Sequence, residues 1–274
     1  MNYRHHFHAG NFADVMKHAV LLALLAAVRA KGPVRLVETH AGAGLYDLHG
    51  DLARRTGEAE AGVGRLMAAE DLPAPLAALK AAVARQNPDG GLRFYPGSPL
   101  VALGALGRGD RYLGYEIRPE DHATLETLVR ERKGQVDARA LQADGYAALA
   151  EGVGRGDLVL IDPPYERGDD YDRAAEAIGL CLERRAGAAL WAPVKDLETL
   201  DALVRRIEAL APRRLLLAEV RLRPLVNPMA MNGSAMLLVD MPDVRAEAEA
   251  ISAWTAAHCG EAGARGTARA ILAR

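Results

Sequence analysis

The chain has 274 residues, of which 50% are hydrophobic, enough to build one large α/β domain or one domain with an insertion. Lys and Arg total 34 against 36 Asp and Glu, a net charge of -2, so any nucleic-acid partner would have to be held by a local basic patch. No run approaches about 18 uncharged apolar residues, which excludes a membrane-spanning helix.

The cysteines and the N-terminus bear on the compartment. Cys181 and Cys259 are far apart and not in metal-ligand spacing, and residues 1–6 lack the order of a secretory signal. We therefore expect a reduced, cytoplasmic protein without a structural metal. We also expect a monomer.

The first predicted element is a helix that begins after Asn11. Asparagine is a good N-cap, Asp14 adds the negative charge favoured in a first turn, and apolar residues recur until a Lys-Gly-Pro stretch. A buried strand is predicted next, at 34–39, and it leads into a turn with Gly42 and Gly44. In a doubly wound sheet, this turn faces a nucleotide-like ligand.

The expected alternation of strands and helices is then interrupted. Helical patterns near 58–70 and 74–84 are followed by a turn-rich Asn-Pro-Asp-Gly-Gly stretch. The delayed helix begins at Ser98, which we predict as its N-cap, with Pro99 as the first helical residue. We therefore expect three segments: the start of the main domain at 1–46, a small helical insertion at 47–97, and the remainder of the main domain at 98–274.

The alternation resumes after the insertion. Strands are predicted at 112–116, 136–141, 157–161, 188–192, 215–220 and 235–240, with helices between them. This pattern predicts a Rossmann-like α/β fold, in which a mainly parallel sheet carries helices on both faces.

The strongest chemical signal is the sequence Asp162-Pro163-Pro164-Tyr165 at the end of the clearest strand. An exocyclic adenine amine is a poor nucleophile, and it becomes cationic as it forms a new bond. A carboxylate and a backbone carbonyl can orient its two N–H groups and stabilise that charge. Prolines remove competing donors, and Tyr165 can stack on a base. Asp162, with a usual pKa of about 3.9, would take the proton during or after transfer. A rigid strand-ending turn is the alternative.

Three further strand ends outline a donor pocket. Gly42 and Gly44 allow close backbone approach, Glu116 suits two ribose hydroxyls, and Asp144 with Gly145 suits an adenine ring. Taken alone, the two glycines could belong to an ordinary turn, and Asp144 could be a solvent-exposed aspartate in an Asp-Gly turn. Their order along the chain, ending in Asp-Pro-Pro-Tyr, favours a binding site.

The N-terminal stretch mixes bases with aromatic residues, which suggests nucleic acid. We expect a local anion-binding patch, with Tyr3 against the target base and only Asp14 as a nearby acid. Its basic members are Arg4, His5, His6, His8 and Lys17. Alternatively, His5, His6 and His8 could be metal ligands. No Cys or carboxylate lies nearby in a spacing that would complete such a site. For His18, a satisfied core histidine is an open alternative.

Several motifs together resemble the RlmJ family of bacterial 23S ribosomal RNA adenine-N6 methyltransferases. They are Tyr3-Arg4-His5, Phe7-His8-Ala9-Gly10-Asn11, Ala13-Asp14-Val15, Lys17-His18, residues 39–44, residues 95–100, Ala143-Asp144-Gly145 and residues 160–165. The resemblance spans most of the chain. It implies a class I methyltransferase fold with a helical subdomain, S-adenosylmethionine as methyl donor, and activity on one adenine of 23S rRNA, preferably free rather than assembled.

The resemblance also implies roles for individual residues. The donor-contacting set would be His18, His40, Ser98, Glu116, Asp144 and Gly145. From the strand-end pattern itself we also expect Gly42, Gly44 and Asp162 at the donor. Asp162, Pro163 and Tyr165 would form the catalytic turn, with Asp162 as proton acceptor. Tyr3 would lie near the substrate base, and the basic patch and stacking arguments above add Arg4, Lys17 and Tyr165 as expected RNA contacts.

Three other functions remain open at this point. The same turn occurs in adenine-N6 methyltransferases that act on DNA. A nicotinamide-dependent oxidoreductase would also use a glycine turn, although a full Gly-x-Gly-x-x-Gly is missing. A non-catalytic RNA-binding module could retain the pocket.

Overall fold

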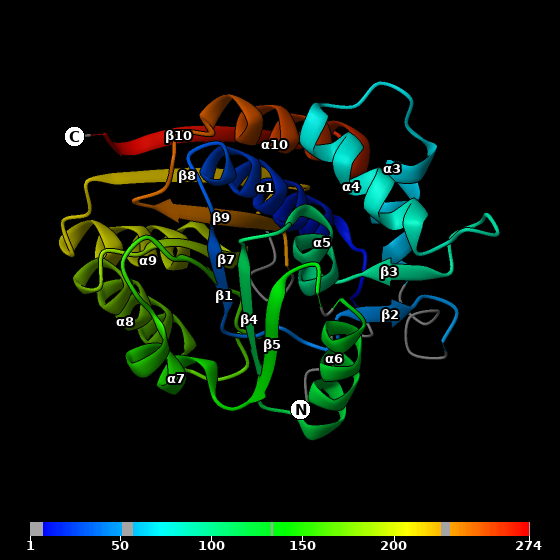
Figure 1. The fold of residues 1–274 in the computed structure, drawn as a ribbon. Coiled ribbons are helices and arrows are strands. Elements are labelled where there is room, and N and C mark those ends of the chain that lie inside the picture. Colours follow the sequence, from blue (N-terminus) through cyan, green and yellow to red (C-terminus); the bar gives the residue numbers. More distant parts are fainter. Residues whose placement is uncertain (1–7, 51–56, 133, 226–230, 274) are drawn as a thin grey trace.

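The computed structural model describes residues 8–50, 57–132, 134–225 and 231–273 (Figure 1). Their centre is an eight-stranded sheet in the order β10-β8-β9-β7-β6-β1-β4-β5. In chain order its strands are β1 (Arg35–Glu38), β4 (Arg111–Glu116), β5 (Asp137–Gln142), β6 (Leu158–Ile161), β7 (Gly187–Val194), β8 (Arg214–Arg221), β9 (Gly233–Val239) and β10 (Arg265–Ala273).

Five strands of this sheet are parallel. β1 lies between β4 and β6, with β5 beyond β4 and β7 beyond β6. The chain thus starts in the middle, runs outward to β5, and then returns to the other side of β1. In such sheets, ligands bind beyond the carboxyl ends of the strands, where the order reverses. Here that point lies between β1 and β6. The remaining strands, β9, β8 and β10, pair antiparallel.

Helices cover both faces of the sheet, as predicted (Figure 1). One hydrophobic core lies under α1 (Phe12–Arg29), α5 (Ser98–Ala105), α6 (Pro119–Glu131) and α10 (Arg245–Cys259). A second core lies under α7 (Gly145–Gly152), α8 (Asp170–Glu183) and α9 (Leu197–Ala209). The Rossmann-like α/β architecture predicted from the sequence is confirmed.

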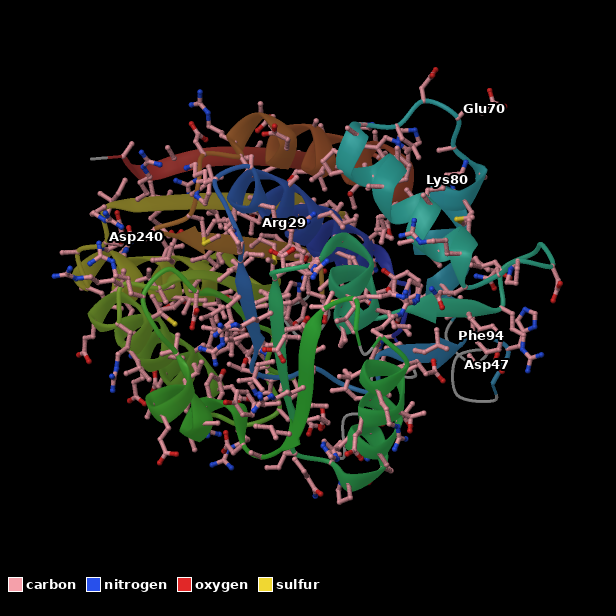
Figure 2. All side chains as sticks on the ribbon, in the orientation of Figure 1. Arg29, Asp47, Glu70, Lys80, Phe94 and Asp240 are labelled. Atoms are coloured by element: carbon pink, nitrogen blue, oxygen red, sulfur yellow. The ribbon has the colours of Figure 1, made fainter. Side chains whose placement is uncertain are left out.

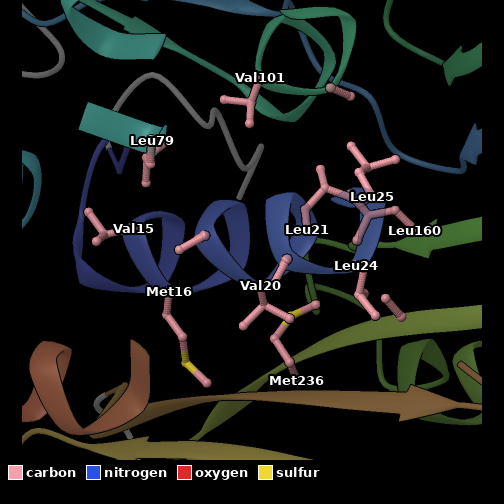
Figure 3. Close-up of a cluster of buried hydrophobic side chains, with 14 of the residues drawn as sticks. Val15, Met16, Val20, Leu21, Leu24, Leu25, Leu79, Val101, Leu160 and Met236 are labelled. Atoms are coloured by element: carbon pink, nitrogen blue, oxygen red, sulfur yellow. The ribbon is translucent and has the colours of Figure 1, made fainter. Parts of the chain in front are cut away.

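The first helix is buried on nearly all sides along its first half. The Asn11 side chain caps it by accepting the N–H groups of Ala13 and Asp14, as predicted. Below it, Val20 points toward Met236 of β9, while other apolar side chains meet the outer helices (Figure 3). Because α1 is sandwiched between the sheet and other helices, even its polar residues near the N-terminus are removed from solvent.

The chain between β1 and α5 adds smaller elements. They are a short antiparallel pair of β2 (Leu45–Asp47) and β3 (Phe94–Pro96), a π-helical turn Glu60–Gly64, α3 (Arg65–Ala68) and α4 (Ala74–Arg85). The helices fall in the two predicted helical stretches, and α4 packs on α1 and α10. The β2–β3 pair was not predicted. Asp47 and Phe94, paired across it, lie at the outer end of the molecule (Figure 2).

The predicted start of α5 is wrong by one residue. Gly97 is the N-cap, and Ser98 is already the first helical residue, without a side-chain bond to the helix backbone. The hydroxyl instead donates to the buried carboxylate of Glu38 at 2.7 Å. This tertiary hydrogen bond replaces the capping bond that the local sequence suggested.

Candidate active site

A cavity of about 750 Å³ lies at the switch point, beyond the carboxyl ends of β1, β4, β6 and β7 and against the start of α1. It brings together most of the predicted site residues: Lys17, His18, His40, Gly42, Ser98, Glu116, Asp162, Pro163 and Tyr165. Gly44, Asp144 and Gly145 do not line it. Tyr3 and Arg4, with His5 and His6, lie outside the described residues.

A second cavity, of about 820 Å³, runs along β5 and α6. It is slightly larger, but none of the predicted site residues lines it. Asp110, a buried carboxylate in its lining, already pairs with Arg29 at 2.6 Å. The chemistry therefore belongs to the cavity at the switch point.

Asp162 is held by a buried cation from α1. The Lys17 ammonium donates to the Asp162 carboxylate at 2.5 Å and lies 3.0 Å from Asp14. Burial lowers the pKa of Lys17, but the two carboxylates outweigh it and the net shift is upward. The three side chains carry a net charge of -1, because the single cation faces two carboxylates. Lys17 and Asp14 are almost fully buried, whereas 16% of the Asp162 side chain is exposed.

This arrangement corrects one prediction. Lys17 was expected to join a basic patch for RNA phosphates, but its ammonium is buried and neutralised by carboxylates. His8, another expected member, pairs with Glu58 at 3.0 Å. The sequence could not show this, because Asp162 is far away in the chain and the environment of α1 depends on the whole fold.

The Asp-Pro-Pro-Tyr turn is locked from the neighbouring strand. Tyr165 has a φ of 52°, a conformation that non-glycine residues rarely adopt. Its hydroxyl donates to the carbonyl of Trp191 in β7 at 2.7 Å. The Trp191 ring packs edge-on to Tyr165, lies 5.6 Å from the Lys17 ammonium, and donates from Nε1 to Ser234. A strained backbone is thus maintained by contacts on several sides.

Glu38 is a buried carboxyl that the sequence patterns did not indicate. It ends β1, is 1% exposed, and accepts the Ser98 hydroxyl. Burial raises the pKa of Glu38 to about 8, with a further contribution from Asp162, against the opposing hydrogen bond from Ser98. A neutral acid at this position would fix the Ser98 hydroxyl at the rim of the cavity. Its position as the last residue of the first strand was the available signal.

The glycine turn after β1 is tied to the end of β4. The Gly42 N–H donates to Glu116 at 2.9 Å, and the Arg118 N–H donates to the other oxygen at 2.8 Å. Gly42 has a φ of +65°, and a Cβ there would collide with the Tyr46 hydroxyl. Burial raises the pKa of Glu116. Each Glu116 oxygen keeps capacity for one more donor from the cavity.

The two histidines predicted to contact the donor differ in environment. His18 is buried, and its Nδ1 lies 2.8 Å from the Tyr95 hydroxyl. His40 packs edge-on to Tyr146, and its Nδ1 lies 2.7 Å from the Thr39 hydroxyl. Burial lowers the pKa of His40 to about 4, so this side chain is neutral near pH 7. Both offer an imidazole to the cavity.

Asp144 and Gly145 have clear structural roles beside the cavity. Asp144 caps α7 through the N–H groups of Tyr146 and Ala147, and its other oxygen pairs with Arg173 at 2.8 Å. Burial alone would raise the pKa of Asp144, but the Arg173 guanidinium outweighs it and the net shift is downward. Gly145 packs so tightly on the end of β1 that a Cβ would overlap the Thr39 carbonyl. The pair joins α7 to the turn that carries His40.

Two other kinds of feature are absent from the residues that the structure describes. No group of three or more His, Cys, Asp or Glu side chains there could hold a metal ion. None of the described helices is long and apolar enough to cross a membrane.

A doubly wound sheet with an Asp-Pro-Pro-Tyr turn and a carboxylate-rimmed glycine turn in one cavity defines a class I methyltransferase that uses S-adenosylmethionine. Comparison with known sequences specifies it further. The profile of the family described as Ribosomal RNA large subunit methyltransferase D, RlmJ, matches residues 31–270, and the chain belongs to this family.

Individual relatives agree with this assignment. The chain is 37% identical over 248 residues to the Ribosomal RNA large subunit methyltransferase J of Escherichia coli (strain K12), covering 88% of each chain. It is 35% identical over 246 residues to the Haemophilus influenzae protein of the same name, again covering 88% of each. A crystal structure of a Legionella pneumophila protein matches with a TM-score of 0.87 at 26% identity, over 96% of this chain and 98% of that one.

Proposed function

We propose that the chain methylates the N6 amino group of an adenine in 23S ribosomal RNA, with S-adenosylmethionine as donor. The observation that carries this proposal is Asp162, which is partly exposed in the cavity while its turn is held by Lys17 and Trp191. Two relatives named as large-subunit ribosomal RNA methyltransferases support the RNA substrate. We further propose a cytoplasmic monomer that acts on free or partly assembled RNA, with the base flipped into the cavity.

The chain's own residues fit the donor. Glu116 has spare acceptor capacity for the ribose hydroxyls, and Ser98, His18 and His40 supply polar groups along the same side of the cavity. We assign Gly42 and Gly44 to the turn that allows close approach, and Asp144 with Gly145 to its support. S-adenosylmethionine supplies an electrophilic methyl group when bound.

The charges around Asp162 suit an amine that becomes cationic. The Lys17 charge is offset by Asp14, so the negative charge of Asp162 remains for the acceptor. Asp162 and the carbonyl of Pro163 orient the two N–H groups of the amine, and Asp162 takes the released proton. Tyr165 supports the turn through Trp191 and offers its ring to the base. Tyr3 and Arg4 remain proposed RNA contacts.

We propose the same division of the chain as the sequence suggested. Residues 47–97 form a small helical insertion, and 1–46 with 98–274 form the methyltransferase domain. The insertion lies between β1 and α5 along the chain. Its position against α1 supports an insertion that stabilises the helix carrying Lys17.

The direct test is mass mapping of N6-methyladenine in ribosomal RNA from cells with and without the protein. One adenine of 23S rRNA should lose its methyl group in the deletion strain and regain it when the gene is restored. Purified protein should transfer the methyl group to protein-free 23S rRNA. Transfer only to DNA, or binding of RNA without turnover, would contradict the proposal.

A further inference from the structure

Two cations lie on one side of Asp162 in the cavity. Lys195 follows β7 directly, Arg223 follows β8 by two residues, and both line the cavity. The sheet order is β8-β9-β7-β6-β1-β4, so these residues lie on the opposite side of Asp162 from Gly42 and Glu116. If the donor occupies the Glu116 side, Lys195 and Arg223 are on the acceptor side.

The backbone of this acceptor side is held firmly. The Asn232 side chain donates to the Lys195 carbonyl at 2.8 Å, and its backbone N–H donates to Val194 at 2.9 Å. The Asn232 carbonyl accepts the N–H of Leu222 at 2.9 Å. One residue therefore joins the ends of β7 and β8, and it sets Lys195 beside the start of the segment that carries Arg223.

The charges of these two side chains are available to a ligand. Within the described part of the chain, Lys195 forms no ion pair. Arg223 pairs with the exposed Glu261 at 3.4 Å, and the two side chains are 45% and 62% exposed. Such surface pairs contribute little and are readily exchanged for another anion. By contrast, Arg118 on the donor side contacts both Glu120 and Asp121.

We propose that Lys195 and Arg223 bind backbone phosphates of the RNA next to the target adenosine. By strand spacing, the two lie roughly 5 and 14 Å from the strand of Asp162, within reach of the neighbouring nucleotides. Trp191 and Pro193 of β7 line the cavity between Asp162 and Lys195, and they form an apolar wall for the flipped base. This assignment gives a chain of net charge -2 a local way to hold RNA, and it rests on the proposed function.

The test compares Lys195→Ala and Arg223→Ala with wild type in steady-state methylation of protein-free 23S rRNA over a salt series. We expect each variant to raise KM for RNA several-fold, with kcat and donor KM unchanged. The plot of log RNA affinity against log salt has a negative slope, and its magnitude should decrease by about 0.7 for each phosphate that the variant no longer neutralises. Lys195→Arg keeps the positive charge, so its RNA affinity should match that of wild type rather than that of Lys195→Ala.

Two exposed residues outside the cavity serve as controls. Lys31→Ala removes an exposed lysine at the end of α1, and Arg206→Ala removes an exposed arginine paired with Asp172, as Arg223 pairs with Glu261. Thermal melting checks that all variants are folded. The inference would be overturned if Lys195→Ala and Arg223→Ala kept the wild-type KM for RNA and salt slope. It would also be overturned if Lys31→Ala and Arg206→Ala changed both quantities as much. Either outcome would leave the proposed function intact. A wild-type protein that transfers no methyl group to RNA would overturn the proposed function itself.

Discussion

At the scale of single residues, the site depends on ionisable groups kept out of water. A buried charge is tolerated only when it is paired, and Lys17 meets this condition through Asp14 and Asp162. Glu38, buried behind Ser98 rather than in the cavity lining, avoids the cost of an unpaired charge by remaining protonated. The same burial that costs stability thus sets the charge state of the cavity.

Asp162→Asn should leave donor affinity nearly unchanged and reduce methyl transfer by orders of magnitude. The amide has one acceptor oxygen and no charge, so it cannot stabilise a cationic amine while Lys17 lies beside it. Titration calorimetry with the donor and single-turnover methylation would measure the two effects. Asp169→Asn, an exposed change in the same loop, is the matched control and should behave as wild type. Turnover within a few-fold of wild type in Asp162→Asn would refute this role.

Glu38→Gln should change how stability depends on pH. In the folded chain the pKa of Glu38 is about 8, well above its usual 4.5, so the native state keeps a proton that the unfolded chain releases. Its contribution to stability is therefore full below about pH 4.5 and is lost as the pH rises to 8, at about 1.4 kcal/mol for each unit of pKa difference. Glutamine does not titrate, so the variant should lose this decline.

Urea unfolding of wild type and Glu38→Gln between pH 5 and pH 8 would measure the effect. The wild type should become less stable over this interval relative to the variant. Parallel curves for the two proteins would show that Glu38 is not protonated in the native state.

At the scale of elements, the turns between strands and helices place the site residues. The end of β1 and the start of α7 are packed against one another, because Gly145 touches the Thr39 backbone. Neither segment can shift without moving the other. The position of His40 is therefore linked to α7, although Gly145 lies outside the cavity lining.

Gly145→Ala should lower both thermal stability and donor affinity. The added Cβ meets backbone atoms of Thr39, which cannot rotate away as a flexible side chain would. Differential scanning calorimetry and donor titration would measure the two changes. Gly154→Ala is a suitable control, because its Cβ would have only an ordinary contact with Asp157. If Gly145→Ala matched the control in both measurements, the close packing of α7 on β1 would contribute neither to stability nor to donor binding.

Much of this element-scale arrangement could be predicted from the sequence. Hydrophobic runs ending in Gly42, Glu116 and Asp162 marked neighbouring strand ends, because a parallel sheet brings its carboxyl ends to one edge. β10 was missed because its small and basic residues carry no clear apolar pattern and its pairing depends on β8. The acidic partners of Lys17 and the bond between Glu38 and Ser98 could not be predicted, since they depend on tertiary contacts rather than local pattern.

At the scale of the whole molecule, the cavity is assembled from distant parts of the chain. Its lining runs from His8, before the first helix, to Cys259 at the end of α10. The donor side comes mainly from the first half of the chain and the acceptor side from the second half. The -2 net charge is therefore compatible with RNA binding if the cations needed are gathered on one side of one cavity.

The ion pair between Lys17 and Asp162 also has a consequence for the order of folding. It joins residues separated by 145 positions, and the sheet under α1 includes β9, which is made later still. Contacts of such long range form only after large loops have closed, which slows folding. During synthesis, α4 and α5 can pack on α1 early, but the surface of α1 that contacts β9 and α10, together with its lysine, must wait for the second half of the chain. We expect native burial of α1 and methyl transfer to be acquired together, late in folding, rather than in separate steps.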